Sequence, residues 1–265
     1  MTNNKVITTK IPNRHGLNIA ILVEIPENPK GLIFIVHGFM SIKEAPHIAA
    51  LGLTSLQQDL IVVRFDATHS FGQSDGSNQG TITTYTHDLE DVIQWAQAQD
   101  WYQEPFILAG HSLGGIAILE ASRKYPSRTK ALALLATVIS GEMDNKGYMA
   151  LDPKGYAEWK ESGFKDWPSR QNPDISIQVP FSHMENRNAY NALRYAPDIS
   201  VPVFMIIGDE DIYFSPANQQ ELYDVLGSAE KEFHIIPNAP HSFIVEEHLQ
   251  QLRALFSNWL KKLCL

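Results

Sequence analysis

The sequence predicts an α/β fold in which a mainly parallel sheet is covered by helices on both faces. Short apolar runs rich in Val, Ile and Phe alternate with segments of helical periodicity along most of the 265 residues. One run, residues 32–36, is continuously apolar, as in a strand that is buried on both faces. Regular alternation of strands and helices places helices on both faces of a parallel sheet.

The first half of the chain contains five predicted strands and three predicted helices. Asn13–Gly16 is typical of a hairpin turn between the first two strands, because Asn and Gly favour turns. Leu89, Val92 and Ile93 fall on one face of the second helix, and Pro126 ends the third. The expected strands are 6–11, 17–25, 32–36, 60–65 and 106–109, and the expected helices are 45–58, 84–99 and 113–125.

The second half continues the alternation but is interrupted once. Its expected strands are 131–137, 203–207 and 232–236, and its expected helices are 216–226 and 245–262. The first two of these strands are separated by about sixty residues, far more than an ordinary loop. We expect residues 141–195 to form an inserted cap on a core of residues 1–140 and 196–265, because an aromatic-rich segment must pack on something. Its aromatic residues are Tyr148, Tyr156, Trp159, Phe164, Trp167, Phe181, Tyr190 and Tyr195.

Composition disfavours several classes of function. There are 21 Lys and Arg against 30 Asp and Glu, for a net charge of −9, so we expect neither nucleic-acid binding nor stable attachment to an anionic membrane. No apolar run is long enough to span a membrane, and the N-terminus lacks the apolar core of a signal peptide, so we expect a cytoplasmic protein. The single cysteine, Cys264, excludes an intramolecular disulfide and a paired-cysteine metal site.

The pattern Gly-x-Ser-x-Gly occurs twice, and only one copy lies between a strand and a helix. Gly110–Gly114, which contains Ser112, follows an apolar strand and leads into the third predicted helix. A serine at that position lies at a helix N-terminus, where backbone N–H groups stabilise an oxyanion. Gly72–Gly76, which contains Ser74, lies in a polar stretch of loop composition. Ser112 is therefore the predicted nucleophile, and Ser74 is predicted to be a loop residue.

The Ser112 motif and three further segments resemble the α/β-hydrolase superfamily, and the resemblance covers nearly the whole chain. His37-Gly38-Phe39, directly after a strand, resembles the oxyanion loop of that superfamily. Gly208–Asp211 resembles its acid-carrying loop, and Asn238–His241 resembles its histidine-carrying loop. The chain order Ser, Asp, His is the order that this fold uses. The resemblance implies an α/β-hydrolase fold with a mainly parallel eight-stranded sheet.

Position selects His241 as the predicted general base among ten histidines. It follows the last strand, at the edge of the sheet where Ser112 is expected. An imidazole accepts and returns a proton near neutrality, which a serine nucleophile requires. The other candidates receive structural interpretations: packing for His111, loop hydrogen bonding for His37, a loop position for His69, a strand interior for His234 and a solvated helix face for His248.

Three neighbouring carboxylates, Asp209, Glu210 and Asp211, compete for the role of acidic partner. The family spacing, in which Asp stands three residues after a strand-ending Gly, favours Asp211 and leaves the other two as solvated loop residues. Such an acid orients the imidazole and stabilises its charged form. The resemblance also implies that the backbone N–H groups of Phe39 and Leu113 form the oxyanion hole.

These motifs predict a serine carboxylesterase that acts on a small-molecule ester and needs no metal or organic cofactor. The cap length and the short motifs look most like small bacterial carboxylesterases, with cinnamoyl/feruloyl esterases and monoacylglycerol lipases as the closest types. A serine aminopeptidase of the same fold is an alternative, and would use an acidic amine site for which Glu158, Glu161 and Glu185 are available. A non-catalytic ligand-binding member is a further alternative. The oligomeric state is left open, with a homodimer as one option.

Overall fold

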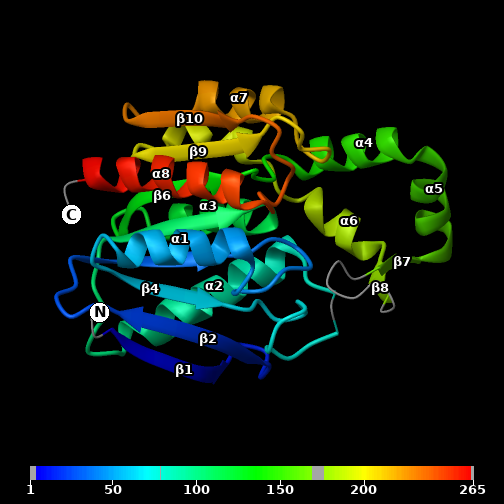
Figure 1. The fold of residues 1–265 in the computed structure, drawn as a ribbon. Helices are drawn as coiled ribbons and strands as arrows, with labels where there is room; N and C mark the ends of the chain where they lie inside the picture. Colours follow the sequence, from blue (N-terminus) through cyan, green and yellow to red (C-terminus); the bar gives the residue numbers. More distant parts are fainter. Residues whose placement is uncertain (1–3, 78, 169–175, 264–265) are drawn as a thin grey trace.

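An eight-stranded sheet forms the centre of the molecule (Figure 1). The computed structural model describes residues 4–77, 79–168 and 176–263. The strands of this sheet are β1 (Lys5–Pro12), β2 (Asn18–Ile25), β3 (Gly31–Val36), β4 (Leu60–Phe65), β5 (Phe106–His111), β6 (Thr129–Leu135), β9 (Val203–Gly208) and β10 (Lys231–Ile236). Their order is β1-β2-β4-β3-β5-β6-β9-β10, and all neighbouring pairs are parallel except the two that involve β2. The mainly parallel eight-stranded sheet predicted from the sequence is confirmed.

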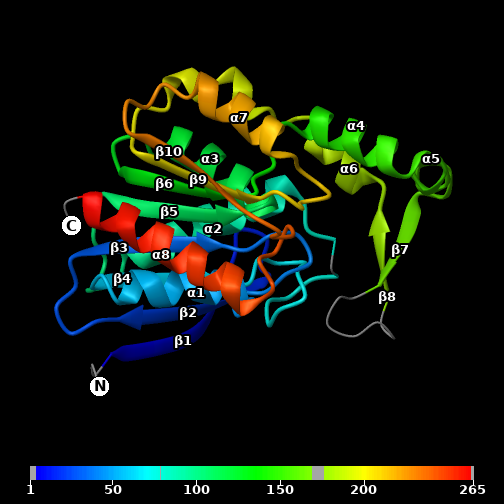
Figure 2. The same cartoon turned by 45° about the horizontal axis from the view of Figure 1, so that its top comes forward.

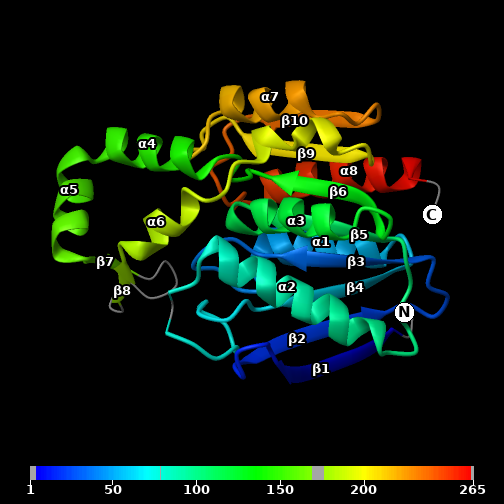
Figure 3. The ribbon, with the colours of Figure 1, turned by 180° about the vertical axis from the view of Figure 1, so that it is seen from behind.

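Five helices cover the two faces of the sheet. They are α1 (Pro46–Leu56), α2 (Ile82–Gln97), α3 (Leu113–Lys124), α7 (Pro216–Val225) and α8 (Glu246–Lys262). Helices α1 and α8 lie on one face, in front of the strands in Figure 2, and pack in one hydrophobic cluster. Helices α2 and α3 lie on the opposite face, in front in Figure 3, and share the second cluster with α7. Each predicted strand and helix is present, with bounds that differ by one or two residues at most.

The strands supply side chains to both clusters because alternate residues point to opposite faces of a sheet. In β3, Leu32, Phe34 and Val36 belong to the α2–α3 side, while Ile33 and Ile35 belong to the α1–α8 side. All five side chains are 1% exposed or less. Burial on both faces explains why this strand reads as an uninterrupted apolar run.

The segment between β6 and β9 leaves the sheet at the carboxyl end of β6 and projects beyond the sheet (Figures 1 and 3). We refer to residues 141–195 as the inserted segment. Its elements are α4 (Gly141–Leu151), α5 (Pro153–Ser162), β7 (Phe164–Pro168), β8 (Ser176–Pro180), α6 (Ser182–Arg187) and the 3₁₀ turn η1 (Ala192–Arg194). A second 3₁₀ turn, η2 (Ala196–Asp198), leads back to β9.

The inserted segment has a small hydrophobic core of its own, centred on Trp159. The Trp159 side chain is buried, and its Nε1–H donates to the carbonyl oxygen of Val179 at 2.8 Å, so its polar atom is satisfied. Ile177, Phe181 and Met184 complete the buried part of this core. The sequence predicted that the aromatic residues here would pack, but not which elements they would form.

No helix of the described residues is both long and apolar enough to cross a membrane. The longest, α8, carries charged residues at both ends and is apolar on only one face.

Close packing joins α3 to the ends of β3 and β5. A methyl group on Gly114 would collide with the backbone carbonyl oxygens of Val36 and His37. A methyl group on Gly110 would collide in the same way with the backbone of Gly114. The glycines of this motif are therefore required by the close approach of a helix to two strands.

We expect Gly114→Ala to lower the free energy of unfolding by about 1–3 kcal/mol, because a backbone carbonyl group cannot move aside for the added methyl group. The control is Gly147→Ala in α4, where the methyl group would meet nothing within 4 Å. That change should stabilise its helix by about 0.5–1 kcal/mol. Urea unfolding of both variants measures the difference, and equal effects would contradict the packing argument.

Candidate functional site

Ser112 occupies a strained turn between β5 and α3. Its φ of 54° and ψ of −116° lie in a region that residues with a side chain rarely adopt. Three backbone hydrogen bonds hold the turn: Ser112 N–H donates to Leu135 O at 2.9 Å, and Ser112 O accepts from Gly115 N and Val138 N. Leu113 is the first residue of α3, so its N–H has no acceptor within the helix. The turn therefore places a hydroxyl group next to a backbone donor that the hydrogen bonds of the helix do not use.

Asp211 and His241 are hydrogen-bonded to each other in the loops that follow β9 and β10. His241 Nδ1 lies 2.6 Å from Asp211 Oδ2 and donates to it. The Asp211 side chain is fully buried, and its Oδ1 accepts from the backbone N–H groups of Tyr213 and Phe214 at 2.9 and 3.1 Å. Three donors thus fix the orientation of the carboxylate, and the carboxylate fixes the tautomer of the imidazole.

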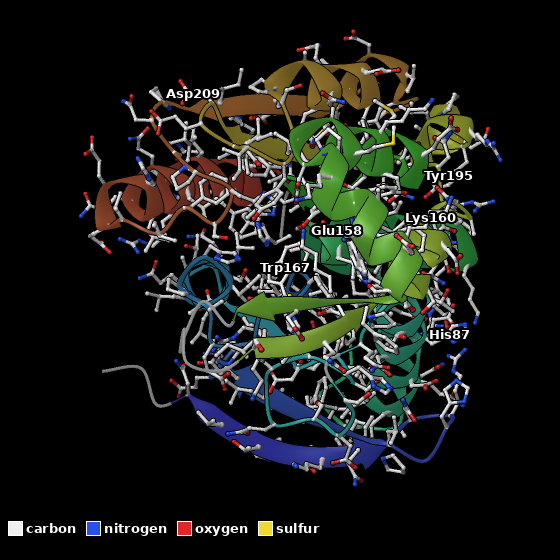
Figure 4. All side chains as sticks on the ribbon, turned by 90° about the vertical axis from the view of Figure 1, so that its right-hand side faces the viewer. His87, Glu158, Lys160, Trp167, Tyr195 and Asp209 are labelled. Atoms are coloured by element: carbon white, nitrogen blue, oxygen red, sulfur yellow. The ribbon has the colours of Figure 1, made fainter. Side chains whose placement is uncertain are left out.

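The two neighbouring carboxylates do not contact His241. Asp209 is exposed, and its Oδ1 accepts from the backbone N–H of Asn238 at 2.6 Å, which ties the acid-carrying loop to the histidine-carrying loop. Figure 4 shows Asp209 toward the outside of the molecule. Glu210 is exposed as well. Of the three competing acids, only Asp211 is paired with the histidine.

His111 links the His241 loop to the turn that carries Ser112. Its Nε2–H donates to the backbone oxygen of His241 at 2.9 Å, and the two ring centroids are 4.7 Å apart. The ring centroid of His111 also lies 4.2 Å from that of His47. Since His111 directly precedes Ser112, this bond ties the loop of His241 to the turn that carries the serine. Sequence reasoning assigned His111 a packing role and missed the hydrogen bond, which depends on a residue 130 positions away.

The loop after β3 lies against the same turn. A methyl group on Gly38 would be 3.1 Å from Cβ of Ser112 and 2.8 Å from Nδ1 of His111, so the Gly38 backbone touches the serine residue. His37 orders this loop as expected: its Nδ1–H donates to Gly38 O at 2.8 Å, and its Nε2 accepts from Ala67 N–H at 3.0 Å. Complete burial lowers the pKa of His37, so the ring is neutral and not a proton carrier at neutral pH.

His183, on α6 of the inserted segment, stacks on the ring of Phe39 with centroids 4.1 Å apart. Its Nδ1–H donates to Gly80 O at 2.8 Å, and its Nε2 accepts from the Arg187 guanidinium. Arg187 is in turn ion-paired with Asp144 of α4. Burial lowers the pKa of His183 to about 4, so the ring is neutral in this arrangement. Sequence reasoning missed His183, because nothing in its local sequence indicates that it contacts residue 39.

Ser74 is a loop residue, as predicted. Its hydroxyl donates to the backbone oxygen of Asp66 at 2.5 Å and accepts from Ala20 N–H at 2.7 Å. The Asp66 carboxylate is fully buried and accepts from Nζ of Lys43 at 2.7 Å. Gly72 packs directly on that carboxylate. The second Gly-x-Ser-x-Gly pattern therefore reflects the packing of a loop around a buried ion pair.

The prediction of a solvated His248 is wrong. The residue is 7% exposed and lies on the buried face of α8, one and two turns before Leu252 and Phe256. Its spacing of four residues from Leu252 was the available signal. His69 and His234 have the structural roles expected: His69 Nδ1 accepts from Ser77 N–H in its own loop, and His234 lies within β10.

The acidic residues considered for an amine site all lie on the solvent-facing side of the inserted segment. Glu158, Glu161 and Glu185 are exposed, and Glu158 pairs loosely with Lys154 at 3.6 Å. Figure 4 shows Glu158 on α5, close to the viewer and outside the core of the segment. In the described part of the chain, no group of three or more His, Cys, Asp or Glu side chains could hold a metal ion. Cys264 lies outside the described residues.

Comparison with known proteins identifies relatives over most of the chain. The family model "Serine aminopeptidase, S33" matches residues 27–192 and 187–248. An uncharacterized 31.7 kDa protein of Escherichia coli is 25% identical over 276 residues, covering 92% of this chain and 96% of that protein. The mouse palmitoyl-protein thioesterase ABHD10 is 28% identical over 150 residues, covering 56% of this chain and 48% of that protein.

Solved structures share the fold over nearly the full length. The structure of mouse ABHD10 matches with a TM-score of 0.78 at 20% identity, and Est1E of Butyrivibrio proteoclasticus with bound ferulic acid matches with a TM-score of 0.81 at 19% identity. Each comparison covers 97% of this chain and 99% of the other. The α/β-hydrolase fold expected from the sequence is confirmed.

We expect His183 to make stability depend on pH. Because its pKa falls from about 6.5 in the unfolded chain to about 4 in the folded one, the unfolded state binds more protons between these values, and stability decreases as pH falls through this window. Between pH 7 and pH 5 the contribution amounts to about 2 kcal/mol.

Urea unfolding of the protein and of His183→Gln at both pH values measures this contribution. The variant should lose about 2 kcal/mol less between pH 7 and pH 5. Parallel loss in the two proteins would show that the buried imidazole is not the group that titrates.

Proposed function

Because this chain belongs to the S33 serine aminopeptidase family of α/β hydrolases, we propose that it hydrolyses carboxylic esters through Ser112, His241 and Asp211. The observation that carries the proposal is the strained turn at Ser112, whose neighbour His111 is hydrogen-bonded to the loop of the Asp211–His241 pair. Backbone strain of this kind persists where the surrounding structure enforces it, and it is concentrated at active sites. The inserted segment is the cap of this site.

In the proposed mechanism, Ser112 attacks the ester carbonyl while Nε2 of His241 accepts the hydroxyl proton. The tetrahedral oxyanion is stabilised by the backbone N–H groups of Phe39 and Leu113. His241 then gives the proton to the departing alcohol, which leaves an acyl group on Ser112. A water molecule that takes the place of the alcohol then gives a proton to His241 and attacks the acyl carbonyl. His241 returns the proton to the Ser112 oxygen as the carboxylic acid leaves. Throughout, Asp211 stabilises the imidazolium form of His241, and it accepts a hydrogen bond without taking the proton.

Two observations favour an ester as substrate over a peptide with a free N-terminal amine. An aminopeptidase needs a buried or shielded acid for the substrate ammonium, and the acids considered for that role on the cap are exposed. Partly buried apolar side chains instead gather where the cap meets the core: Phe39, Met40, Phe71, Tyr148, Tyr156 and Trp167. Apolar side chains of this kind suit contact with an apolar acyl or aryl group.

The similar proteins are consistent with this substrate class. Est1E has been captured with ferulic acid, an aromatic carboxylic acid, and ABHD10 is named for cleavage of palmitoyl thioesters. A panel of aryl esters, short and long acyl esters, acyl thioesters and amino-acid amides therefore tests the specificity. Faster turnover of the amides than of every ester would overturn the ester assignment.

We expect Ser112→Ala to abolish turnover of a p-nitrophenyl ester, with a fall in kcat of more than about 10³-fold. The same variant should resist stoichiometric labelling by a fluorophosphonate. Ser74→Ala is the matched control, since that hydroxyl is engaged with the backbone of Asp66 and Ala20, and it should keep nearly full activity per folded molecule. Activity that survives in Ser112→Ala, or is lost equally in Ser74→Ala, contradicts the nucleophile assignment.

We expect Asp211→Asn to lower kcat by roughly 10⁴-fold with little change in KM, because an amide that donates to Nδ1 holds the imidazole in the wrong tautomer. Glu210→Gln, the same kind of change one residue earlier at an exposed side chain, should leave kcat unchanged. Steady-state kinetics on one ester measures both. Similar losses in the two variants would mean that the charge of the loop matters and the bond to His241 does not.

A further inference from the structure

The peptide bond between Gly38 and Phe39 is anchored through its carbonyl oxygen. Gly38 O accepts two hydrogen bonds, from Nδ1–H of His37 at 2.8 Å and from the hydroxyl group of Tyr85 at 3.0 Å. Tyr85 lies on α2, 47 residues after Gly38 in the chain, and its side chain is fully buried. The N–H of this peptide, on Phe39, is one of the two proposed oxyanion donors, and Tyr85 has no role among the proposed catalytic groups.

Both donors are held in one protonation state and one orientation. Because Nε2 of His37 accepts from Ala67 N–H, the ring proton resides on Nδ1 and faces Gly38 O. Burial raises the pKa of Tyr85 well above its usual value, so its hydroxyl group keeps its proton. The Tyr85 ring meets the His37 ring edge to face, with centroids 5.3 Å apart, and packs closely on Gly80, where an added methyl group would be 2.9 Å from Cε2 of Tyr85.

A peptide group is planar and trans, so its N–H points opposite to its C=O. With the carbonyl of Gly38 directed at Tyr85, the N–H of Phe39 is directed to the other side of the peptide. Gly38 packs against the turn of Ser112. We expect the Phe39 N–H to face the place where the ester oxygen of a bound substrate would develop its charge. Two hydrogen bonds to the carbonyl also polarise the peptide and strengthen its N–H as a donor.

We propose that Tyr85 is a positioning residue of the oxyanion hole. Its hydrogen bond to the carbonyl oxygen of Gly38 fixes the direction in which the Phe39 N–H points. The proposal rests on the proposed function, because it concerns a donor that matters only if an oxyanion forms at Ser112. It places a determinant of the reaction rate inside the hydrophobic core, on α2 and outside the loop that carries the donor.

The test is Tyr85→Phe, which removes one hydroxyl group and keeps the ring. Loss of a whole oxyanion donor costs about 10²–10³-fold in kcat. Loosening the donor while His37 still holds the carbonyl should cost about 10-fold in kcat, with KM changed by less than about 2-fold. Affinity for a trifluoromethyl ketone, which forms a tetrahedral adduct with the serine, should fall by the same factor as kcat/KM. Affinity for the matching unreactive ether should stay unchanged.

Tyr195→Phe is the matched control. It removes another largely buried tyrosine hydroxyl, which donates to Glu120 at 2.7 Å away from the Gly38 loop. Rates are expressed per active site titrated with a fluorophosphonate, and thermal unfolding is recorded for each variant, so that a general loss of structure is separated from a loss of positioning. Tyr195→Phe should keep the kcat and the ketone affinity of the unmodified protein.

The results separate this inference from the proposed function. If the protein hydrolyses esters in a Ser112-dependent way and Tyr85→Phe keeps its kcat and its ketone affinity, the role of Tyr85 is overturned and the proposed function stands. The role of Tyr85 is also overturned if Tyr85→Phe raises KM and weakens binding of the ether by the same factor as it lowers kcat, because that outcome indicates a general disturbance of the site. If the unmodified protein neither hydrolyses the esters nor binds the ketone, both proposals fall together.

Discussion

The close approach of α3 to the ends of β3 and β5 is the constraint on which the arrangement of the candidate site depends. The approach requires backbone without side chains at Gly110 and Gly114, and it forces Ser112 into a positive φ. The turn also brings the first amide of α3 and the loop after β3 to the same point. Strain at one residue is tolerated because the hydrogen bonds of the surrounding strands determine the path of the chain on both sides.

Imidazole groups at strand ends connect the loops around that turn. His37 ties the loop after β3 to the one after β4, and His111 ties the end of β5 to the loop after β10. His37 uses both ring nitrogens for backbone partners and His111 uses Nε2, so these histidines define geometry. His241 instead has Nδ1 on a carboxylate and Nε2 on the opposite side of the ring. Residue type alone does not distinguish these roles; the partners of the two nitrogens do.

The inserted segment is coupled to the core through the loop after β3. The hydrophobic core around Trp159 stabilises the inserted segment beyond the edge of the sheet. The stack of His183 on Phe39 brings α6 into contact with the loop next to Ser112. The ion pair between Arg187 and Asp144 keeps α6 and α4 together behind this contact. The stack of His183 on Phe39 is therefore one route by which a change in the segment reaches the backbone beside the serine.

The amino-acid sequence by itself determined the order of the elements, the choice of Ser112 over Ser74, and the spacing that favours Asp211 over its neighbours. These features are local: an apolar run, a glycine or a proline acts within a few residues of its own position. Tertiary structure alone decided that Tyr85 and His183 reach the loop after β3 and that His111 holds the loop of His241. Each of these facts joins side chains to segments that are distant in the chain, and the packing of the helices on the sheet, which no local pattern encodes, determines which distant residues meet.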